Sequence, residues 1–419
     1  MKILLANLPA YYDAHPNRHF IASGSRWSFS FDAPKDHRHP HYQPYPFSLG
    51  FAAAILRDAG YEVDGFDGCA LNMDEAEWLY RVEASHPDTL IVEVPTVVFP
   101  LAMALLRRVR GVSKVLVTGP HVTALPGSAG DFATIPGEWE TFAVGRLAFH
   151  DYPFPDRQFF PNELYSNFEF HRPSAQLLTS RGCFAQCIFC VERHVYGWGL
   201  GLRSMSATRV VDEMASVQAL GARQVWFDDM SITAKPGHIQ GICRELLERG
   251  LDLPWTTMCD MNASEATVKQ MAEAGCIGVA FGVETIDEGV LRGIGKPFVS
   301  KEKALWFTAL LKDLGIHSVG TFALGLPGQS ATTIRQDIAF GLHELGADSV
   351  QFSIATPFPG TPFYRLCDAK GWLVTKDWTQ YDGARWSVVD YPELKHSEIE
   401  LLHQYAMEQR REQGMGFRK

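Results

Sequence analysis

The chain has 419 residues, which is enough for two or three domains with their own cores. It is 46% apolar and 12% aromatic, as in ordinary globular proteins, and its formal charge of −10 excludes generic nucleic-acid binding, which needs a basic surface. No apolar run approaches the roughly 18 residues that cross a bilayer, and the N-terminus lacks a signal-peptide cleavage pattern, so we expect a cytoplasmic protein with no membrane span.

The first 150 residues alternate short apolar runs with amphipathic segments. Strands are predicted at "MKILLANLP", "YEVDGFDG", "DTLIVEVPT" and "SKVLVTGPH", and helices at "FSLGFAAAILRDAG", which ends at Gly60, and at residues 101–109. This alternation predicts a doubly wound, Rossmann-like parallel sheet, in which ligands bind beyond the carboxyl ends of the strands. Those ends are Pro9, Pro95-Thr96, Gly119-Pro120-His121 and Gly137-Glu138.

A long segment, residues 11–46, separates the first strand from its helix and is rich in His, Pro and aromatic residues. His37, His39 and His41 alternate there and could share one side of an extended chain as metal ligands. Neither cysteines nor clustered carboxylates accompany them, so we interpret the segment as a lid or a substrate-contacting loop.

From Gln176 onward, six strand-like runs recur: "QLLTS", "RQVWF", "WTTMC", "IGVAFG", "HSVGTFALG" and "SVQFSI". Each but the last is followed by a helical segment, which predicts an incomplete TIM-type barrel of six strand–helix units. The polar and glycine-rich clusters "FDDMS", "CDMNAS", "GVETID", "GLPGQS" and "TPFPGTP" each follow a strand, so all of them fall on the carboxyl-terminal rim.

Three of the eight cysteines, Cys183, Cys187 and Cys190, follow the first barrel strand in "SRGCFAQCIFC"; the other five are single and fit buried free thiols. A reducing compartment favours metal or redox chemistry for such a cluster. Structural zinc would need a fourth ligand, for which His194 is the candidate. Because the loop faces the rim clusters, an iron–sulfur cluster with one open iron fits better.

The "CFAQCIFC" run resembles the CxxxCxxC signature of radical S-adenosylmethionine (radical SAM) enzymes, and "WFDD", "FGVET", "GTFALGLPGQS" and "TPFPGTPFY" follow in the family's order. The N-terminal half is similar to the cobalamin-binding domain of one large subclass, through "PFSLGFAAAILRDAGYEV", "VLVTGPHVTALP" and "IPGEWET". The resemblance implies an α/β protein with a Rossmann-like cobalamin-binding domain (1–150), a linker (151–174), a partial (β/α)6 barrel (175–375) and a C-terminal helical extension (376–419).

The resemblance implies that Cys183, Cys187 and Cys190 hold a [4Fe-4S] cluster whose open iron is chelated by SAM. It places Phe189 beside the adenine, Glu284 at the SAM ribose, and Asp228, Asp229 and Gly325 among the remaining cofactor contacts. From the residues alone, Glu284 could instead be a solvated acid at a helix N-terminus, and the Asp228-Asp229 pair could cap the following helix.

On the cobalamin side, the resemblance implies contacts from the backbone around Gly119, Pro120, His121, Val122 and Thr123, from the Gly137-Glu138 turn and from Thr96. Two departures from the family pattern stand out: Thr118-Gly119 replaces its Gly-Gly, and Asp260-Met261-Asn262 replaces an arginine after the third barrel strand. We do not expect His15 of "DAHPN" to ligate cobalt, because the glycine of the cobalt-ligating motif is Arg18 here.

The activity that the resemblance implies is methylation of an unactivated carbon. SAM would be cleaved reductively to a 5′-deoxyadenosyl radical that removes a substrate hydrogen, and the methyl group would come from methylcobalamin. The expected partners are a small-molecule biosynthetic intermediate and an electron donor such as flavodoxin or ferredoxin. Three alternatives stay open: a radical cyclase or rearrangement enzyme with the same cofactors, a non-catalytic cobalamin binder, and a barrel enzyme that binds no cobalamin.

Overall fold

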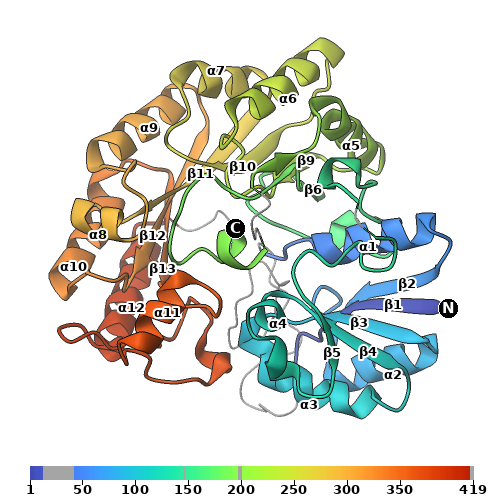
Figure 1. Ribbon diagram of the computed structural model, residues 1–419. Helices are drawn as coiled ribbons and strands as arrows, with labels where there is room; N and C mark the ends of the chain where they lie inside the picture. Colours follow the sequence, from blue (N-terminus) through green and yellow to red (C-terminus); the bar gives the residue numbers. More distant parts are fainter. Residues whose placement is uncertain (13–41, 146, 197–200, 416–419) are drawn as a thin grey trace.

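The computed structural model describes residues 1–12, 42–145, 147–196 and 201–415, and Figure 1 shows its two parallel sheets side by side. The N-terminal sheet has the strand order β2-β1-β3-β4-β5, so the direction of strand addition reverses between β1 and β3. Its strands are β1 (Lys2–Asn7), β2 (Glu62–Asp67), β3 (Thr89–Glu93), β4 (Lys114–Thr118) and β5 (Ala133–Ile135). Its helices are α1 (Phe47–Asp58), α2 (Glu75–Ser85), α3 (Phe99–Val109) and α4 (Pro120–Ala124).

Strand β1 shows why this sheet forms. Ile3 and Leu5 pack with the apolar residues of α1 on one face, while Leu4 and Ala6 pack with those of α2 and α3 on the other. A strand covered on both faces needs a continuous apolar run, and "KILLAN" supplies one. The doubly wound prediction is therefore confirmed.

The second sheet is an open, six-stranded parallel arc in which each strand pairs with its neighbours in chain order, as in a partial barrel. Its strands are β6 (Ser174–Leu177), β9 (Gln224–Phe227), β10 (Trp255–Cys259), β11 (Cys276–Glu284), β12 (His317–Leu324) and β13 (Ser349–Ile354). Helices line its outer side (Figure 1): α5 (Ala207–Ala219), α6 (Pro236–Arg249), α7 (Glu265–Glu273), α8 (Glu288–Gly293), α9 (Lys301–Asp313) and α10 (Ala331–Ala339).

Serine side chains fix the starts of four barrel helices. Ser206, Ser264, Ser300 and Ser330 each accept a hydrogen bond from the backbone N–H three residues further on, at α5, α7, α9 and α10 respectively. Each such cap is worth about 1 kcal/mol. The caps set where each loop ends, and so they help to fix the rim.

The linker closes the amino-terminal mouth of the barrel. Phe168 contacts the Trp226 ring at 5.8 Å, and its backbone carbonyl accepts hydrogen bonds from Gln224 and Thr256 at the starts of β9 and β10. Gly278 at the start of β11 makes this possible, because a Cβ there would lie 2.9 Å from the Phe168 ring. The opposite, carboxyl-terminal rim remains the place where chemistry can be reached.

The C-terminal part differs in one respect from the sequence-based expectation, because the last barrel strand is also followed by a helix, α11 (Pro362–Ala369). The expected C-terminal helix is α12 (His396–Glu412), and it packs beside β13. Between the two helices, Trp378 of the short turn η7 (Trp378–Gln380) packs against the apolar cores of both sheets. In the described part of the chain, no helix combines the length and the apolar character that a bilayer span requires.

Candidate active site at the carboxyl ends of both sheets

The three clustered cysteines lie on a loop between the short strand β7 (Ser180–Arg181) and the turn η5 (Glu192–Tyr196). All three are free thiols; Cys187 is buried, and the other two are half-buried. Two backbone hydrogen bonds hold the loop: Ile188 N–H donates to the Ile294 carbonyl at 3.0 Å, and Phe363 N–H donates to the Ile188 carbonyl at 3.1 Å. The segment after α8 and the start of α11 therefore fix the loop from two sides.

His194, the candidate fourth ligand of a zinc site, is engaged with the backbone of the cysteine loop. Its ring donates from Nε2 to the Cys187 carbonyl at 3.1 Å. Within the described ranges of the chain, no three His, Cys, Asp or Glu side chains form a group that could hold a metal ion. Three thiols of one loop are the protein ligands that an iron–sulfur cluster with one open iron takes.

Burial dominates the titration of the cysteine thiols in the absence of metal. It raises the pKa of Cys190 to about 12 and that of Cys187 to about 11, although the nearby Lys296 ammonium lowers the latter. Metal binding to these residues must therefore release protons.

Glu284 at the end of β11 is paired with a lysine that the sequence did not single out. Lys296 Nζ lies 2.8 Å from Glu284 Oε1 and donates to the Gly282 carbonyl at 2.7 Å. Glu284 has φ of +65°, which is rare for a residue with a side chain and typical of functional positions. The pair is largely buried beside the cysteine loop. Burial alone would lower the Lys296 pKa, but the Glu284 carboxylate and the thiols of Cys187 and Cys183 together outweigh burial and raise it.

The two consecutive aspartates after β9 have different surroundings. Asp228 accepts a hydrogen bond from the Trp226 indole N–H at 3.0 Å and lines the pocket described below. Asp229 accepts from the Thr179 hydroxyl at 3.0 Å and from the Ser180 hydroxyl, so it anchors the chain that leads into the cysteine loop. Neither caps the next helix, because α6 begins after Lys235 without a side-chain cap.

Two other residues of the barrel side are engaged within the fold. Phe189 is half-buried and packs against the barrel core. Gly325 has φ of +89°; its N–H donates to Gln329 at 2.8 Å, and its carbonyl accepts from the Tyr391 hydroxyl at 2.8 Å.

The loops at the carboxyl edge of the N-terminal sheet pack closely on one another. Gly119 has φ of +109°, and a Cβ there would lie 2.8 Å from the Val94 carbonyl oxygen, so only glycine fits. The Thr123 hydroxyl donates to the Gly119 carbonyl and accepts from the Gly137 N–H, both at 2.8 Å. The structure thus brings these residues together at one edge.

His121, flanked by the buried Pro120 and Val122, is enclosed completely at this edge. Its ring stacks on Phe99 at 3.9 Å and meets the edge of Trp378 at 5.1 Å, while Nδ1 lies 3.3 Å from the Thr96 hydroxyl. Burial lowers its pKa to about 4. Nε2 has no hydrogen-bond partner among the residues that the structure describes, and a buried polar atom of this kind usually faces a ligand or water.

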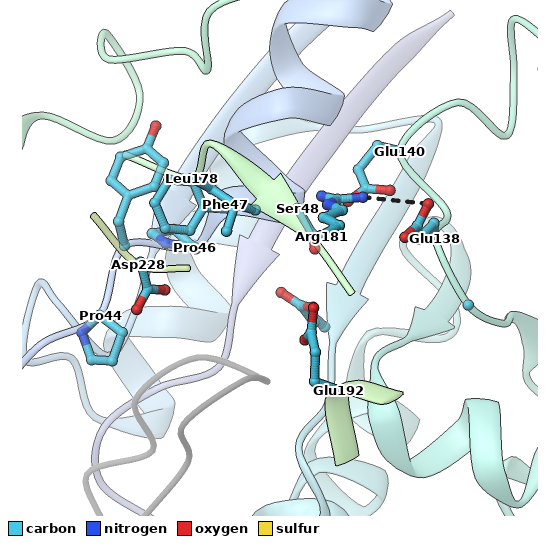
Figure 2. Close-up of a pocket in the computed structure, with 13 residues that line it drawn as sticks. Pro44, Pro46, Phe47, Ser48, Glu138, Glu140, Leu178, Arg181, Glu192 and Asp228 are labelled. Carbon is cyan, nitrogen blue, oxygen red and sulfur yellow. Dashed lines mark hydrogen bonds and ion pairs between the residues drawn. The ribbon is translucent and has the colours of Figure 1, made fainter. Parts of the chain in front are cut away.

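A pocket with about 610 Å³ of empty space lies at the seam between the two sheets (Figure 2). The N-terminal domain contributes Phe47, Glu93, Glu138 and Glu140, and the barrel contributes Leu178, Arg181, Glu192 and Asp228. Both walls of the pocket come from the carboxyl edges of parallel sheets, where ligands of such folds bind.

Comparison with known proteins agrees with this arrangement. Residues 177–341, which contain the cysteine loop and β9 to β12, match the family model described as "Radical SAM superfamily". These residues therefore form a radical SAM domain. The match begins at the last residue of β6 and covers the Glu284–Lys296 pair as well as the three cysteines.

Two curated relatives and one solved structure are similar to this chain over longer or different ranges. It is 26% identical to the "Uncharacterized methyltransferase PH0819" of Pyrococcus horikoshii over 80% of this chain and 81% of the relative. It is 31% identical to the cytidylyl-2-hydroxyethylphosphonate methyltransferase of Streptomyces wedmorensis, over 47% of this chain but only 38% of that protein. The radical SAM methyltransferase TsrM of Kitasatospora setae, solved with tryptophan and a SAM analogue, superposes with a TM-score of 0.68 over 94% of this chain and 80% of TsrM, at 19% identity. The last match shows the shared fold of both domains.

One departure from the radical SAM pattern has a local explanation. Asp260, where the family has an arginine after the third strand, accepts hydrogen bonds from the Ser231 and Thr233 hydroxyls, both at 2.8 Å. It therefore ties the loops after β9 and β10 together. His15, Arg18 and the alternating histidines 37, 39 and 41 lie outside the described residues, as do most of segment 11–46 and residues 197–200.

Proposed function

We propose that this protein is a cobalamin-dependent radical SAM methyltransferase. The observation that carries the proposal is the position of the Cys183, Cys187 and Cys190 loop, which lies at the barrel rim next to a pocket shared with the carboxyl edge of a Rossmann-like domain. The methyltransferase names of both curated relatives and of TsrM agree with it.

In this proposal the three cysteines hold a [4Fe-4S] cluster, and SAM binds next to it. Phe189, Asp228, Asp229, Glu284 and Gly325 surround SAM, with Lys296 keeping the Glu284 carboxylate in place. The cluster and cobalamin, when bound, supply the electron for SAM cleavage and the carrier of the methyl group. The protein itself binds and orients the reactants and keeps water from the pocket.

The cobalamin part of the proposal rests on the edge of the N-terminal sheet. Thr96, Gly119, Pro120, His121, Val122, Thr123, Gly137 and Glu138 come together there, and His121 Nε2 is left without a partner among the described residues. The strand order β2-β1-β3-β4-β5 puts this edge beside the switch point of the sheet, where ligands of doubly wound folds bind.

The partners follow from the chemistry of the site. The acceptor is a small molecule that fits the seam pocket, and TsrM with bound tryptophan is one protein of this fold that takes such a substrate. We propose that flavodoxin or ferredoxin donates the electron and that the protein works in the cytoplasm, where an oxygen-sensitive cluster can be kept reduced.

The decisive experiment is anaerobic reconstitution with iron and sulfide, followed by metal analysis and by incubation with SAM and a reductant. We expect four irons per chain, 5′-deoxyadenosine as a product, and a cobalamin spectrum after addition of cobalamin. Replacing Cys187 by alanine should abolish cluster binding and SAM cleavage, whereas the same change at the buried Cys243 of α6 should leave both intact. Stoichiometric zinc in place of iron would overturn the proposal, and a cluster without cobalamin binding would reduce it to a radical SAM enzyme of another kind.

A further inference from the structure

Four charged side chains form a network across the seam between the two domains. Arg181 Nη2 lies 2.6 Å from Glu140 Oε1, and Arg181 Nη1 lies 3.7 Å from Glu138 Oε2. Arg203 completes the network through both of its terminal nitrogens, one of which donates to Glu138 Oε2 at 2.7 Å. Figure 2 shows the Arg181 side chain beside the two glutamates at the pocket wall.

The two sides of the network belong to different parts of the fold. Glu138 and Glu140 follow β5 of the N-terminal sheet, whereas Arg181 and Arg203 sit opposite each other on the paired strands β7 and β8 (Arg203–Ser204) of the barrel side. Arg181 precedes Cys183 by two residues. The network therefore joins the N-terminal domain directly to the root of the cysteine loop.

Aromatic rings enclose the guanidinium of Arg181 on its other sides. It lies 4.8 Å from the ring centre of Phe149, 5.5 Å from that of Tyr152 and 5.7 Å from that of Phe51. The side chains of Arg181 and Glu140 are only 8% and 1% exposed. Such a guanidinium has few alternative positions, because moving it would separate a buried charge from its partner.

A gain in folding free energy does not explain why this ion pair is buried. Desolvation cancels most of the attraction in a buried ion pair, so a well-packed apolar pair of the same volume often gives equal or greater stability. What a buried pair provides is a single register, because Arg181 and Glu140 meet in only one relative position of the two surfaces. A fixed register matters here, since the pair connects the two halves of the pocket.

We propose that the Arg181–Glu140 pair is a positioning device that fixes the cysteine loop relative to the N-terminal domain, so that transfer between SAM and cobalamin depends on it while SAM cleavage at the cluster does not. The inference rests on the proposed function. Arg181 and Glu140 act through the loops that carry them and not on the reacting atoms.

The experiment compares two reactions of SAM that need no substrate. With reductant alone, one electron from the cluster breaks the SAM carbon–sulfur bond to the nucleoside and gives methionine and a 5′-deoxyadenosyl radical. A second electron from the excess reductant and a proton from water convert this radical to 5′-deoxyadenosine, which accumulates. With cobalamin reduced to cob(I)alamin, the electron pair of cobalt takes the methyl group, the methyl–sulfur bond breaks, and S-adenosylhomocysteine leaves. The first reaction takes place within the barrel, whereas the second requires both domains in register.

The variants are Arg181→Gln, Glu140→Gln, the double variant and Arg181→Lys. In the first three, we expect formation of S-adenosylhomocysteine to fall by about tenfold to a hundredfold, because misplacement by about 1 Å has effects of this size, while 5′-deoxyadenosine stays within about twofold. Arg181→Lys keeps one charged contact and should recover part of the loss. The matched control is Arg108→Gln, which breaks the Arg108–Glu75 pair between α3 and α2, away from the Arg181 network.

Stability and amide exchange separate positioning from folding. Arg181→Gln leaves Glu140 as an unpaired buried charge, and Glu140→Gln leaves Arg181 with only its longer contact to Glu138, whereas the double variant removes both charges. The double variant should therefore be the most stable of the three while remaining defective in methyl transfer to cobalamin. Without any cofactor, deuterium uptake at residues 182–191 and 136–142 should rise in the variants and not in the Arg108 control.

Three results would overturn the inference. They are recovery of methyl transfer in the double variant, parallel losses of both SAM reactions, and unchanged amide exchange in both segments. Failure of the wild-type protein to bind iron or cobalamin would instead contradict the proposed function, and amide exchange would still report on the pair.

Discussion

At the scale of single residues, His121 shows how burial fixes the protonation state of a site. Its ring is enclosed between Phe99 and Trp378, so the charged form would lose its hydration without gaining an anionic partner. The folded protein therefore keeps the ring neutral down to a pH of about 4, the value to which burial lowers its pKa.

This burial has a consequence for stability that can be measured. The unfolded chain binds a proton at His121 below pH of about 6.5, whereas the folded protein does not, so stability is fully present above that pH and is lost as the pH falls towards 4. His121→Asn should remove a loss of the order of 3 kcal/mol between these values, seen as a flatter pH profile of urea denaturation. Burial also lowers the pKa of His238 to about 4, and this residue contributes the same pH dependence of stability in the wild-type protein and in the His121 variant. The exposed His150→Asn serves as the control. An unchanged profile would contradict this account.

The residues of the site differ in how far the sequence could predict them. The three cysteines could be predicted because their spacing within one loop carries the information. Lys296 could not, because its partner Glu284 is twelve residues away and only the turn between α8 and α9 brings them together. Glu140 and Arg181 meet across 41 residues and two domains, and nothing in either local motif indicates the pair.

At the scale of elements, the cysteine loop depends on a glycine outside it. Gly295 follows α8 with φ of +79°, and a Cβ there would overlap the carbonyl oxygen of Gln186 in the cysteine loop. The absence of a side chain thus lets the two segments lie close enough for the Ile188–Ile294 hydrogen bond.

Gly295→Ala should therefore weaken cluster binding. The strained backbone alone costs about 1–2 kcal/mol, and the overlap adds displacement of the loop, so we expect a lower iron and sulfide content after reconstitution. Gly293→Ala, at the last residue of the same helix, meets no atom within 4 Å and should keep the wild-type content. Equal iron content in the two variants would show that the loop is not fixed from this side.

Strands and helices were predictable where the sequence carries its own periodicity. The six barrel strands are four to nine residues long and carry buried apolar residues, and the serine caps mark helix starts. The helix α11 escaped prediction because it is short and follows the proline-rich run "TPFPGTP". The closure of the barrel by Phe168 depends on packing with Gly278 more than a hundred residues later, which no local pattern reveals.

At the scale of the whole molecule, one apolar core runs from the α1 face of the N-terminal sheet into the barrel, and a second core covers the opposite face of that sheet. Trp378, from the C-terminal extension, packs against both, with its ring 4.9 Å from Tyr381 on one side and 5.1 Å from His121 on the other. Interfaces between domains are the usual weak points of cooperativity, so such a residue couples their unfolding.

Trp378→Ala should cost about 2–3 kcal/mol and broaden the calorimetric transition, because a contact that joins the two cores is lost. Trp306→Ala, on the outer helix α9 where the ring is 43% exposed and meets Phe307, should lower the transition temperature less and keep its shape. A single, uniformly shifted transition in the Trp378 variant would mean that other contacts dominate the coupling.

The packing of Phe168 at the amino-terminal end of the barrel also decides where the polypeptide can be cut. Phe168 precedes the first barrel strand, yet its ring and its carbonyl complete the packing around Trp226, Gln224 and Thr256. If the chain were cut directly before β6, the barrel would lose these contacts and Trp226 would be exposed to solvent. An isolated barrel must therefore include the segment that contains Phe168.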